Sequence, residues 1–151
     1  MKWRALVAGV ITPVLFNMII ATVLVASPAS AEVRIVGDPG GQVAAYLQKY
    51  REIRDSGQKV VIDGACLSAC TLLTAIIPRD RVCITQRAML GFHAASYYDD
   101  TSRQFVPTRA GSRVVMGYYP PDIRRWIMQH GGLTPHIIQL RGRELAAELL
   151  E

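Results

Sequence analysis

Apolar residues recur along the first part of the chain with the spacing of a strand and then with that of a helix. Residues 33–36 are a short, largely apolar run that ends at the turn residues 37–41. Apolar side chains then recur every three or four residues up to Gly57, which predicts a strand followed by an amphipathic helix. The helical positions are Val43, Tyr46, Leu47, Tyr50 and Ile53.

The same order repeats in the next stretch of sequence. Residues 59–63 predict a buried strand, residues 64–67 a tight turn and residues 68–77 a second helix. Two more strands are predicted at residues 81–85 and 88–93. Repeated strand–helix–strand order favours a mostly parallel sheet flanked by helices, so the predicted fold class is α/β.

The pattern is weaker in the last third of the chain. Residues 96–106 predict a hairpin that lies over the candidate site. Pro121 and Asp122 predict the start of a helix, and Gly131 and Gly132 its end. Thr134-Pro135 then predicts the start of a last helix, with the threonine as N-cap.

The first 31 residues have the pattern of a signal peptide. A short basic start precedes an almost wholly apolar run at residues 5–26, and residues 29–31 match a signal-peptidase site. We expect cleavage after Ala31, which leaves a single exported domain at residues 32–151 in the periplasm or outside the cell. The apolar run approaches the roughly 20 residues that span a bilayer, so the alternative is an uncleaved inner-membrane anchor.

The charge of the chain is mildly basic and evenly spread. The formal net charge is +5, and +3 without the two basic residues at the start. The basic residues form no block of five or six, which is typical of a solvated surface. We therefore expect no nucleic-acid partner.

Three cysteines, Cys66, Cys70 and Cys83, lie in the expected mature domain. In an oxidising compartment a disulfide is the usual fate of such residues. Cys66 and Cys70 are close enough to pair, but their side chains point poorly toward each other on one helical turn, and Cys83 could pair with either. Three pairings remain open. A zinc site would need a fourth ligand at finger-like spacing, which is missing, so we expect no metal.

Ser68 and His93 are the candidate catalytic residues. A serine needs a base to take its proton, and its acyl intermediate needs N–H groups aimed at the oxyanion. The Pro39-Gly40-Gly41 turn could supply such backbone donors. The alternatives are a helix-capping role for Ser68, a buried structural role for His93 and an ordinary turn at residues 39–41.

These segments resemble the Clp protease proteolytic subunit family, within the wider crotonase-like fold. In that family a Pro-Gly-Gly turn precedes a helix, a Gly-x-x-x-Ser turn holds the nucleophile, and a strand about 25 residues on carries the catalytic histidine. Residues 39–41, 64–68 and 91–93 occur here in the same order and spacing. The resemblance covers roughly residues 33–95. It is closest to small exported members that are described only as predicted periplasmic proteins.

The resemblance implies a role for each residue. Ser68 would be the nucleophile, His93 the base, and the N–H groups of Gly40 and Ala69 the oxyanion donors. The family also places an aspartate after the histidine, and Asp122 is the nearest candidate by order. The inserted helical region that precedes the family's aspartate has no counterpart in this chain. A Ser–His pair with an oxyanion hole retains activity without the acid.

Two functions are compatible with these residues. The first is an exported serine hydrolase that acts as a peptidase on a peptide or protein substrate, without a cofactor. The second is a non-catalytic crotonase-like domain that binds a peptide or an envelope protein in the same pocket or at its sheet edge. Thioester chemistry is less favoured, because coenzyme A is not expected outside the cytoplasm. Either function is compatible with an oligomer.

Overall fold

The computed structural model describes residues 31–150. The predicted signal peptide, apart from its last residue, lies outside them. Among the described residues, no helix is long enough and apolar enough to cross a membrane.

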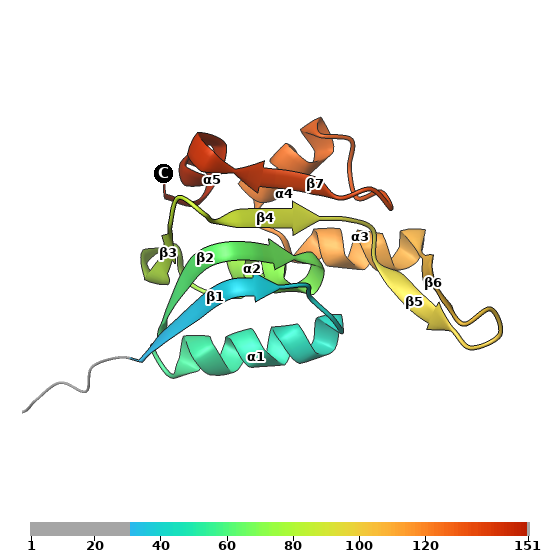
Figure 1. Cartoon of the computed structure of the whole chain (residues 1–151), viewed down its shortest axis with the longest axis horizontal. Coiled ribbons are helices and arrows are strands. Elements are labelled where there is room, and N and C mark those ends of the chain that lie inside the picture. Colours follow the sequence, from blue (N-terminus) through green and yellow to red (C-terminus); the bar gives the residue numbers. More distant parts are fainter. Residues whose placement is uncertain (1–30, 151) are drawn as a thin grey trace, which may run out of the picture.

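Strands and helices alternate as far as residue 84, after which three more strands and then two helices follow in succession (Figure 1). The strands are β1 (Glu32–Asp38), β2 (Lys59–Leu67), β3 (Val82–Ile84), β4 (Met89–Phe92), β5 (Ser96–Asp99), β6 (Gln104–Pro107) and β7 (Ile138–Arg141). The helices are α1 (Val43–Asp55), α2 (Leu73–Ile76), α3 (Arg109–Tyr118), α4 (Pro121–Gln129) and α5 (Gly142–Leu150). Two 3₁₀ turns, η1 (Ser68–Leu72) and η2 (Arg79–Arg81), flank α2.

Five strands form one mostly parallel sheet with β2 at its centre. β1 pairs with one edge of β2, while β3 and β4 pair with successive parts of the other edge, all in parallel. β7 joins the free edge of β4 in antiparallel orientation. The predicted α/β class, with a mostly parallel sheet flanked by helices, is confirmed.

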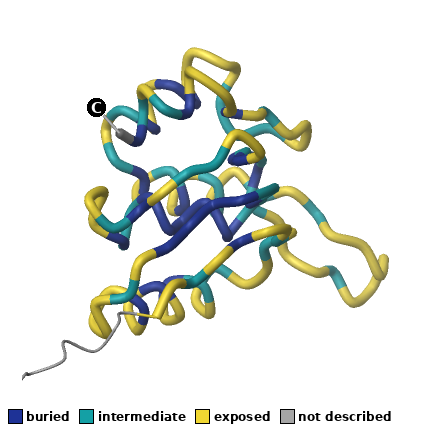
Figure 2. The backbone as a smooth tube through the Cα atoms, turned by 60° about the vertical axis from the view of Figure 1, so that its left-hand side comes forward, coloured by how far each residue is buried: buried dark blue, intermediate teal, exposed yellow. Residues whose placement is uncertain are grey.

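The core forms where the central strands meet the helices. Val60 and Ile62 of β2 and Leu90 and Phe92 of β4 are fully buried, and Figure 2 shows the buried backbone concentrated at this centre. α1 contributes Leu47, Tyr50 and Ile53, the buried face that its apolar spacing predicted. Burial of each large apolar side chain contributes about 1.5 to 3 kcal/mol to the stability of the fold, so these buried residues hold the helices against the sheet.

Three local predictions differ from the structure. Residues 64–67 continue β2 instead of turning, because they pair with β4. Thr134-Pro135 does not start a helix; the antiparallel strand β7 follows, and the last helix begins at Gly142. The predicted helix at residues 68–77 is instead the 3₁₀ turn η1 followed by the four-residue helix α2. In addition, helix α3 was not predicted. In the first two cases sheet pairing with β4 overrides the local turn and cap signals.

A buried carboxylate on β2 is neutralised by basic residues from neighbouring strands and loops. Asp63 accepts hydrogen bonds from Arg87, Thr85 and Arg34 at donor–acceptor distances of 2.6 to 3.1 Å. The two hydrogen bonds from Arg87, followed by that from Thr85, hold the pKa of Asp63 well below its usual range. Asp63 should therefore stabilise the fold only while it is ionised.

Asp63→Asn should lower the free energy of unfolding at pH 7, and its effect should shrink in acid. The folded-state pKa is depressed, so the stabilisation is fully present above about pH 4, the usual aspartate range, and is lost as pH falls toward the folded-state value. Urea unfolding at pH 7 and pH 3 measures the difference. Asp100→Asn, an exposed change in the hairpin turn, is the control. If Asp63→Asn lowered the unfolding free energy equally at the two pH values, the ionised Asp63 carboxylate would not be the source of the stabilisation.

Candidate active site

Ser68 lies at the junction between β2 and the 3₁₀ turn η1, in a conformation that is unusual for a side-chain-bearing residue. Its φ angle is 55°, in the left-handed region that favours glycine. The turn η1 is preceded by Leu67 and has no side-chain cap, so the Ser68 hydroxyl does not serve as one. A sharp strand-to-helix turn of this kind presents a serine oxygen at the end of a sheet.

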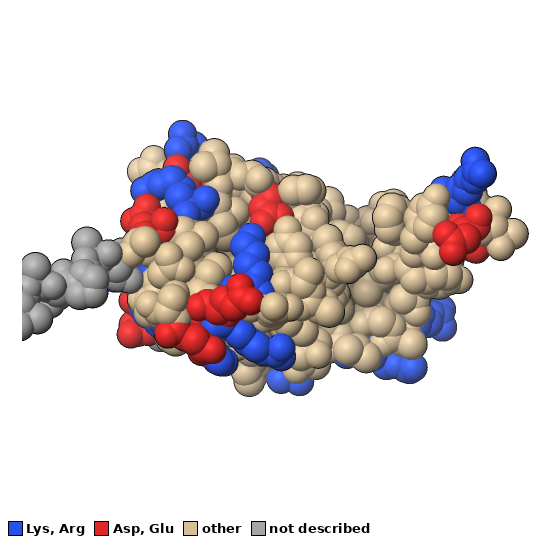
Figure 3. All heavy atoms as spheres, turned by 90° about the horizontal axis from the view of Figure 1, so that it is seen from below, with Lys and Arg blue, Asp and Glu red and all other residues tan. Residues whose placement is uncertain are grey.

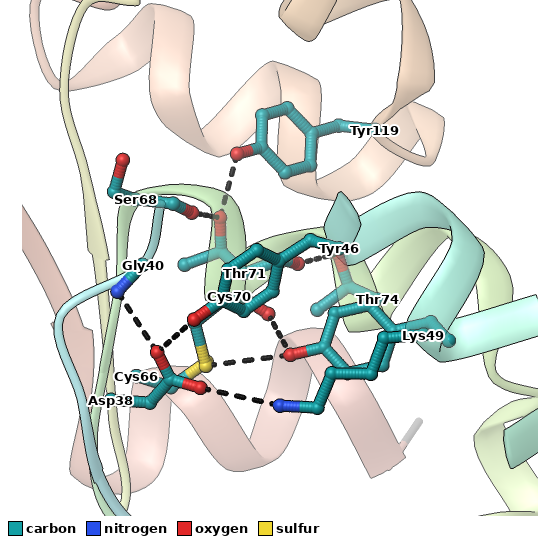
Figure 4. The surroundings of a disulfide bond; sticks show 11 residues. Asp38, Gly40, Tyr46, Lys49, Cys66, Ser68, Cys70, Thr71, Thr74 and Tyr119 are labelled. Carbon is teal, nitrogen blue, oxygen red and sulfur yellow. Dashed lines mark hydrogen bonds and ion pairs between the residues drawn. A yellow bond between two sulfur atoms is a disulfide. The ribbon is translucent and has the colours of Figure 1, made fainter. Parts of the chain in front are cut away.

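A disulfide spans the turn that holds Ser68. Cys66 at the end of β2 is bonded to Cys70 in η1, with a Cα–Cα distance of 5.3 Å (Figure 4). Tyr50 of α1 donates a hydrogen bond to the Cys70 carbonyl oxygen at 2.8 Å. The expected disulfide is confirmed, and Cys83 is left free and exposed. The disulfide is compatible with an exported protein.

Removal of this disulfide should loosen both the fold and the site. We expect the Cys66→Ala/Cys70→Ala variant to lose about 2 to 4 kcal/mol of unfolding free energy, because its unfolded chain is no longer cross-linked. Urea unfolding under non-reducing conditions measures this loss, with Cys83→Ser as the control. Three free thiols titrated in the unfolded, non-reduced wild-type protein would show that the disulfide does not form.

Two buried hydroxyl groups hold the backbone of Ser68. Thr71 Oγ1 donates to the Ser68 carbonyl oxygen at 2.6 Å, and the Tyr119 hydroxyl lies 2.6 Å from the same Thr71 oxygen. A threonine hydroxyl has one proton, so Tyr119 must donate to Thr71. Burial raises the pKa of Tyr119 to about 12, which keeps this donor protonated at neutral pH. In Figure 4 the Ser68 hydroxyl points away from this chain of hydrogen bonds.

The Pro39-Gly40-Gly41 turn passes directly against the Ser68 turn. Gly40 has a φ of 83°. A Cβ atom there would lie 2.5 Å from the Leu67 carbonyl oxygen, 2.7 Å from Ser68 Cβ and 2.8 Å from the Ala69 nitrogen. Only glycine fits this approach. The structure therefore brings the predicted Gly40 and Ala69 together beside Ser68.

The Gly40 N–H group is nevertheless occupied. It donates to Asp38 Oδ1 at 2.9 Å, and the same oxygen accepts a hydrogen bond from the Tyr46 hydroxyl. Lys49 lies 3.6 Å from the other carboxylate oxygen. Asp38 thus closes an Asx-type turn over residues 38–40. In this conformation the Gly40 N–H group already has an acceptor in Asp38, and its role as an oxyanion donor stays a prediction.

His93 follows β4 and has a defined ring orientation. Its Nδ1 atom lies 2.8 Å from the Ala94 carbonyl oxygen. A carbonyl oxygen only accepts, so Nδ1 carries the proton in the neutral ring and Nε2 is left free to accept one. The side chain of His93 is half-buried, and the alternative of a structural role for it stays open.

Ser68 and His93 face the same cavity of about 700 Å³. No hydrogen bond joins their side chains among the interactions of residues 31–150. The wall of the cavity comes from the turn after β1, the start of η1, the base of the hairpin and α3. It consists of Pro39, Gly40, Gly41, Gln42, Val43, Ser68, Ala69, His93, Ala95, Ser96, Tyr98, Phe105, Val115 and Tyr119.

The cavity wall contains no Asp, Glu, Lys or Arg side chain among the described residues. In Figure 3 charged side chains gather on the body at the end away from the hairpin and at the hairpin tip, and uncharged atoms cover most of the surface between. Tyr98 and Phe105 from the β5–β6 hairpin pack edge to face, with ring centroids 5.3 Å apart. Phe105 is 72% exposed. The predicted hairpin is confirmed, and it supplies an aromatic wall that a bound molecule would cover.

The structure does not bring Asp122 to His93. Asp122 is at the start of α4, where its carboxylate forms an ion pair with Arg79. It is not among the residues of the cavity wall. The group that lies within hydrogen-bond distance of His93 Nδ1 is the carbonyl group of Ala94.

Two residues of the site, Thr71 and Tyr119, carry no signal in the sequence. Their side chains are joined by a hydrogen bond although they are 48 residues apart in the chain.

No family model matches the chain, and no curated protein matches its sequence. Among residues 31–150, no group of three His, Cys, Asp or Glu side chains could hold a metal ion. A function for the site is therefore inferred from its geometry.

Proposed function

We propose that this chain is an exported serine hydrolase, of the peptidase class, that uses Ser68 as nucleophile and His93 as base. One observation carries the proposal: Ser68 is held in a left-handed strand-to-3₁₀ turn at the wall of the cavity that His93 also lines. Such backbone strain costs about 1 to 3 kcal/mol and persists only where the surroundings enforce it. A disulfide and two buried hydroxyl groups supply that enforcement here.

The chemistry follows from the free nitrogen of His93. Ser68 Oγ attacks the carbonyl carbon of the substrate amide while its proton passes to Nε2. The tetrahedral adduct then collapses, the proton moves to the leaving amine, and the acyl group remains on Ser68. A water oxygen then attacks the acyl carbon while one water proton passes to Nε2. As the ester bond breaks, that proton moves to Ser68 Oγ, and the carboxylic acid is released. The Ala94 carbonyl plays the orienting part, because it fixes the tautomer that leaves Nε2 unprotonated.

The oxyanion donors are the Ala69 N–H group and a second N–H group from the 39–41 turn. Gly40 can take this part only after its hydrogen bond to Asp38 opens. A neutral carbonyl also stabilises the imidazolium form of His93 less than a carboxylate would. Both features favour a slow hydrolase over an efficient one.

The substrate class follows from the cavity wall. Uncharged and aromatic side chains surround Ser68, and none of the wall residues is an acid, a lysine or an arginine. An acyl group with an apolar side chain would bury surface against Tyr98, Phe105 and Val115. We therefore expect a peptide or protein substrate with an apolar residue at the scissile bond.

A fluorophosphonate probe tests the proposal without knowledge of the natural substrate. An activated serine should take up one probe per chain, and peptide mapping by mass spectrometry should place it on Ser68. Denatured protein is the control, because an unactivated serine does not react. A probe found on another residue, or on none, would contradict the assignment.

A non-catalytic binding domain is the second candidate function. Two observations favour it: the side chains of Ser68 and His93 share no hydrogen bond in the described structure, and the Gly40 N–H group is taken by Asp38. In that case the same apolar cavity would hold a peptide of an envelope protein without cleaving it. Saturable peptide binding with no labelling of Ser68 would support this function over the hydrolase.

A further inference from the structure

A second cavity of about 630 Å³ lies on another face of helix α3 and shares no wall residue with the first. Val115 and Tyr119 face the Ser68 cavity, while Arg109, Ser112 and Arg113 face this one. The full wall is Ala94, Pro107, Thr108, Arg109, Ser112, Arg113, Met116, Met128, Leu133, Thr134 and Pro135. The proposed hydrolase reaction uses one of these residues, Ala94, through its backbone carbonyl, and uses none of their side chains.

One part of this second cavity is apolar and adaptable. Met116 from α3, Met128 from α4 and Leu133 from the following loop form it. Met128 is 63% exposed although it is a large apolar side chain. Methionine is flexible and polarizable, and it is overused on surfaces that accept varied partners. This wall therefore fits apolar side chains of a bound molecule.

The other part of the second cavity is cationic. Arg109 and Arg113 are four residues apart on α3, which places them one helical turn apart on the same face. Both are exposed, and neither forms an ion pair with any carboxylate of residues 31–150. No acidic residue lines the cavity. Guanidinium groups bind carboxylates through paired hydrogen bonds, so the two arginines favour an occupant with two carboxylates.

We propose that this second cavity is a docking site for an acidic, apolar peptide segment of another protein. Two carboxylates on one side of an extended peptide would bind Arg109 and Arg113, and the alternating apolar side chains on its other side would pack on Met128 and Leu133, which come from elements other than α3. The spacing of the two arginines agrees with that of two carboxylates on a bound peptide. Side chains one helical turn apart are about 5 to 6 Å apart at Cβ, and alternate side chains of an extended peptide are about 7 Å apart. The proposal stands apart from the hydrolase function, since neither Ser68 nor His93 contributes.

The test uses a fluorescein-labelled, end-blocked peptide in which three leucines alternate with two glutamates. Binding to the purified Ser68→Ala chain, which cannot cleave the peptide by the proposed route, is followed by fluorescence anisotropy. Arg109→Gln/Arg113→Gln should weaken binding roughly tenfold or more, because two charge-assisted contacts are lost. Arg124→Gln/Arg125→Gln removes the same charge from exposed positions of α4 outside the cavity and should change the affinity less than about twofold.

Matched peptides separate the two parts of the cavity. Replacing the leucines with serines, or the glutamates with lysines, should abolish saturable binding, and Met128→Ser should weaken it. Equal losses in the two double-arginine variants would show only long-range attraction and overturn the proposal, as would a missing response to the acidic peptide. Binding of anionic phospholipid vesicles without binding of the peptide would assign the surface to a membrane and also overturn it. Thermal unfolding confirms that each variant is folded, as its exposed positions predict.

Discussion

Ser68→Ala should abolish labelling by a fluorophosphonate probe and leave the domain folded. The hydroxyl is the only group lost, and its removal leaves the backbone bond between Thr71 and the Ser68 carbonyl in place. Labelling rates from gel fluorescence, together with a thermal melt, measure the two effects. Ser96→Ala is the matched control, because Ser96 lines the same cavity and is exposed. Equal labelling of wild type and Ser68→Ala would eliminate the hydrolase.

His93→Ala should slow the same labelling by about two to four decades, the usual contribution of a general base. His136→Ala, an exposed change outside the cavity, is the control. A rate that His93→Ala leaves unchanged would assign His93 a structural part.

Much of the fold was predictable because its elements are locally encoded. The three-to-four-residue spacing of Leu47, Tyr50 and Ile53 is the buried face of α1, and the repeated strand–helix order led to the parallel sheet. β7 was missed because it is four residues long and follows Pro135, where turn signals dominate. Ile138 and Leu140 point inward and alternate with exposed neighbours, but so short a pattern identifies a strand only once β4 is known to pair with it.

The site was predictable to the extent that its parts are sequence motifs. Ser68, His93 and the Pro39-Gly40-Gly41 turn were expected together, and they line one cavity. The Asp122–Arg79 ion pair could not be foreseen, since its partners are 43 residues apart. The hydrogen bond from the Gly40 N–H group to Asp38 could have been foreseen, because an aspartate side chain often accepts a hydrogen bond from the backbone N–H group two residues on.

Gly64 shows how the sheet itself positions the site. Two residues of β2, Asp63 and Gly64, lie opposite the single residue Val36 of β1, so the ladder has a bulge there. A Cβ atom on Gly64 would lie 1.7 Å from the Val36 carbonyl oxygen. Beyond the bulge, β1 ends at Asp38, which holds the turn against Ser68. The close approach of the two strands at Gly64 therefore sets the place of the 39–41 turn.

Gly64→Ala should consequently impair both the fold and the chemistry. We expect a loss of about 3 kcal/mol or more of unfolding free energy, because the obstacle to the new methyl group is backbone that cannot rotate away. Urea unfolding measures the loss, and probe labelling of the folded fraction should also slow as β1 moves away from Ser68. Gly37→Ala, in the facing strand, is the matched control, since its Cβ atom would meet nothing within 4 Å. If the two alanine variants were equally stable, the bulge would not constrain β1, and the 39–41 turn would be held by Asp38 alone.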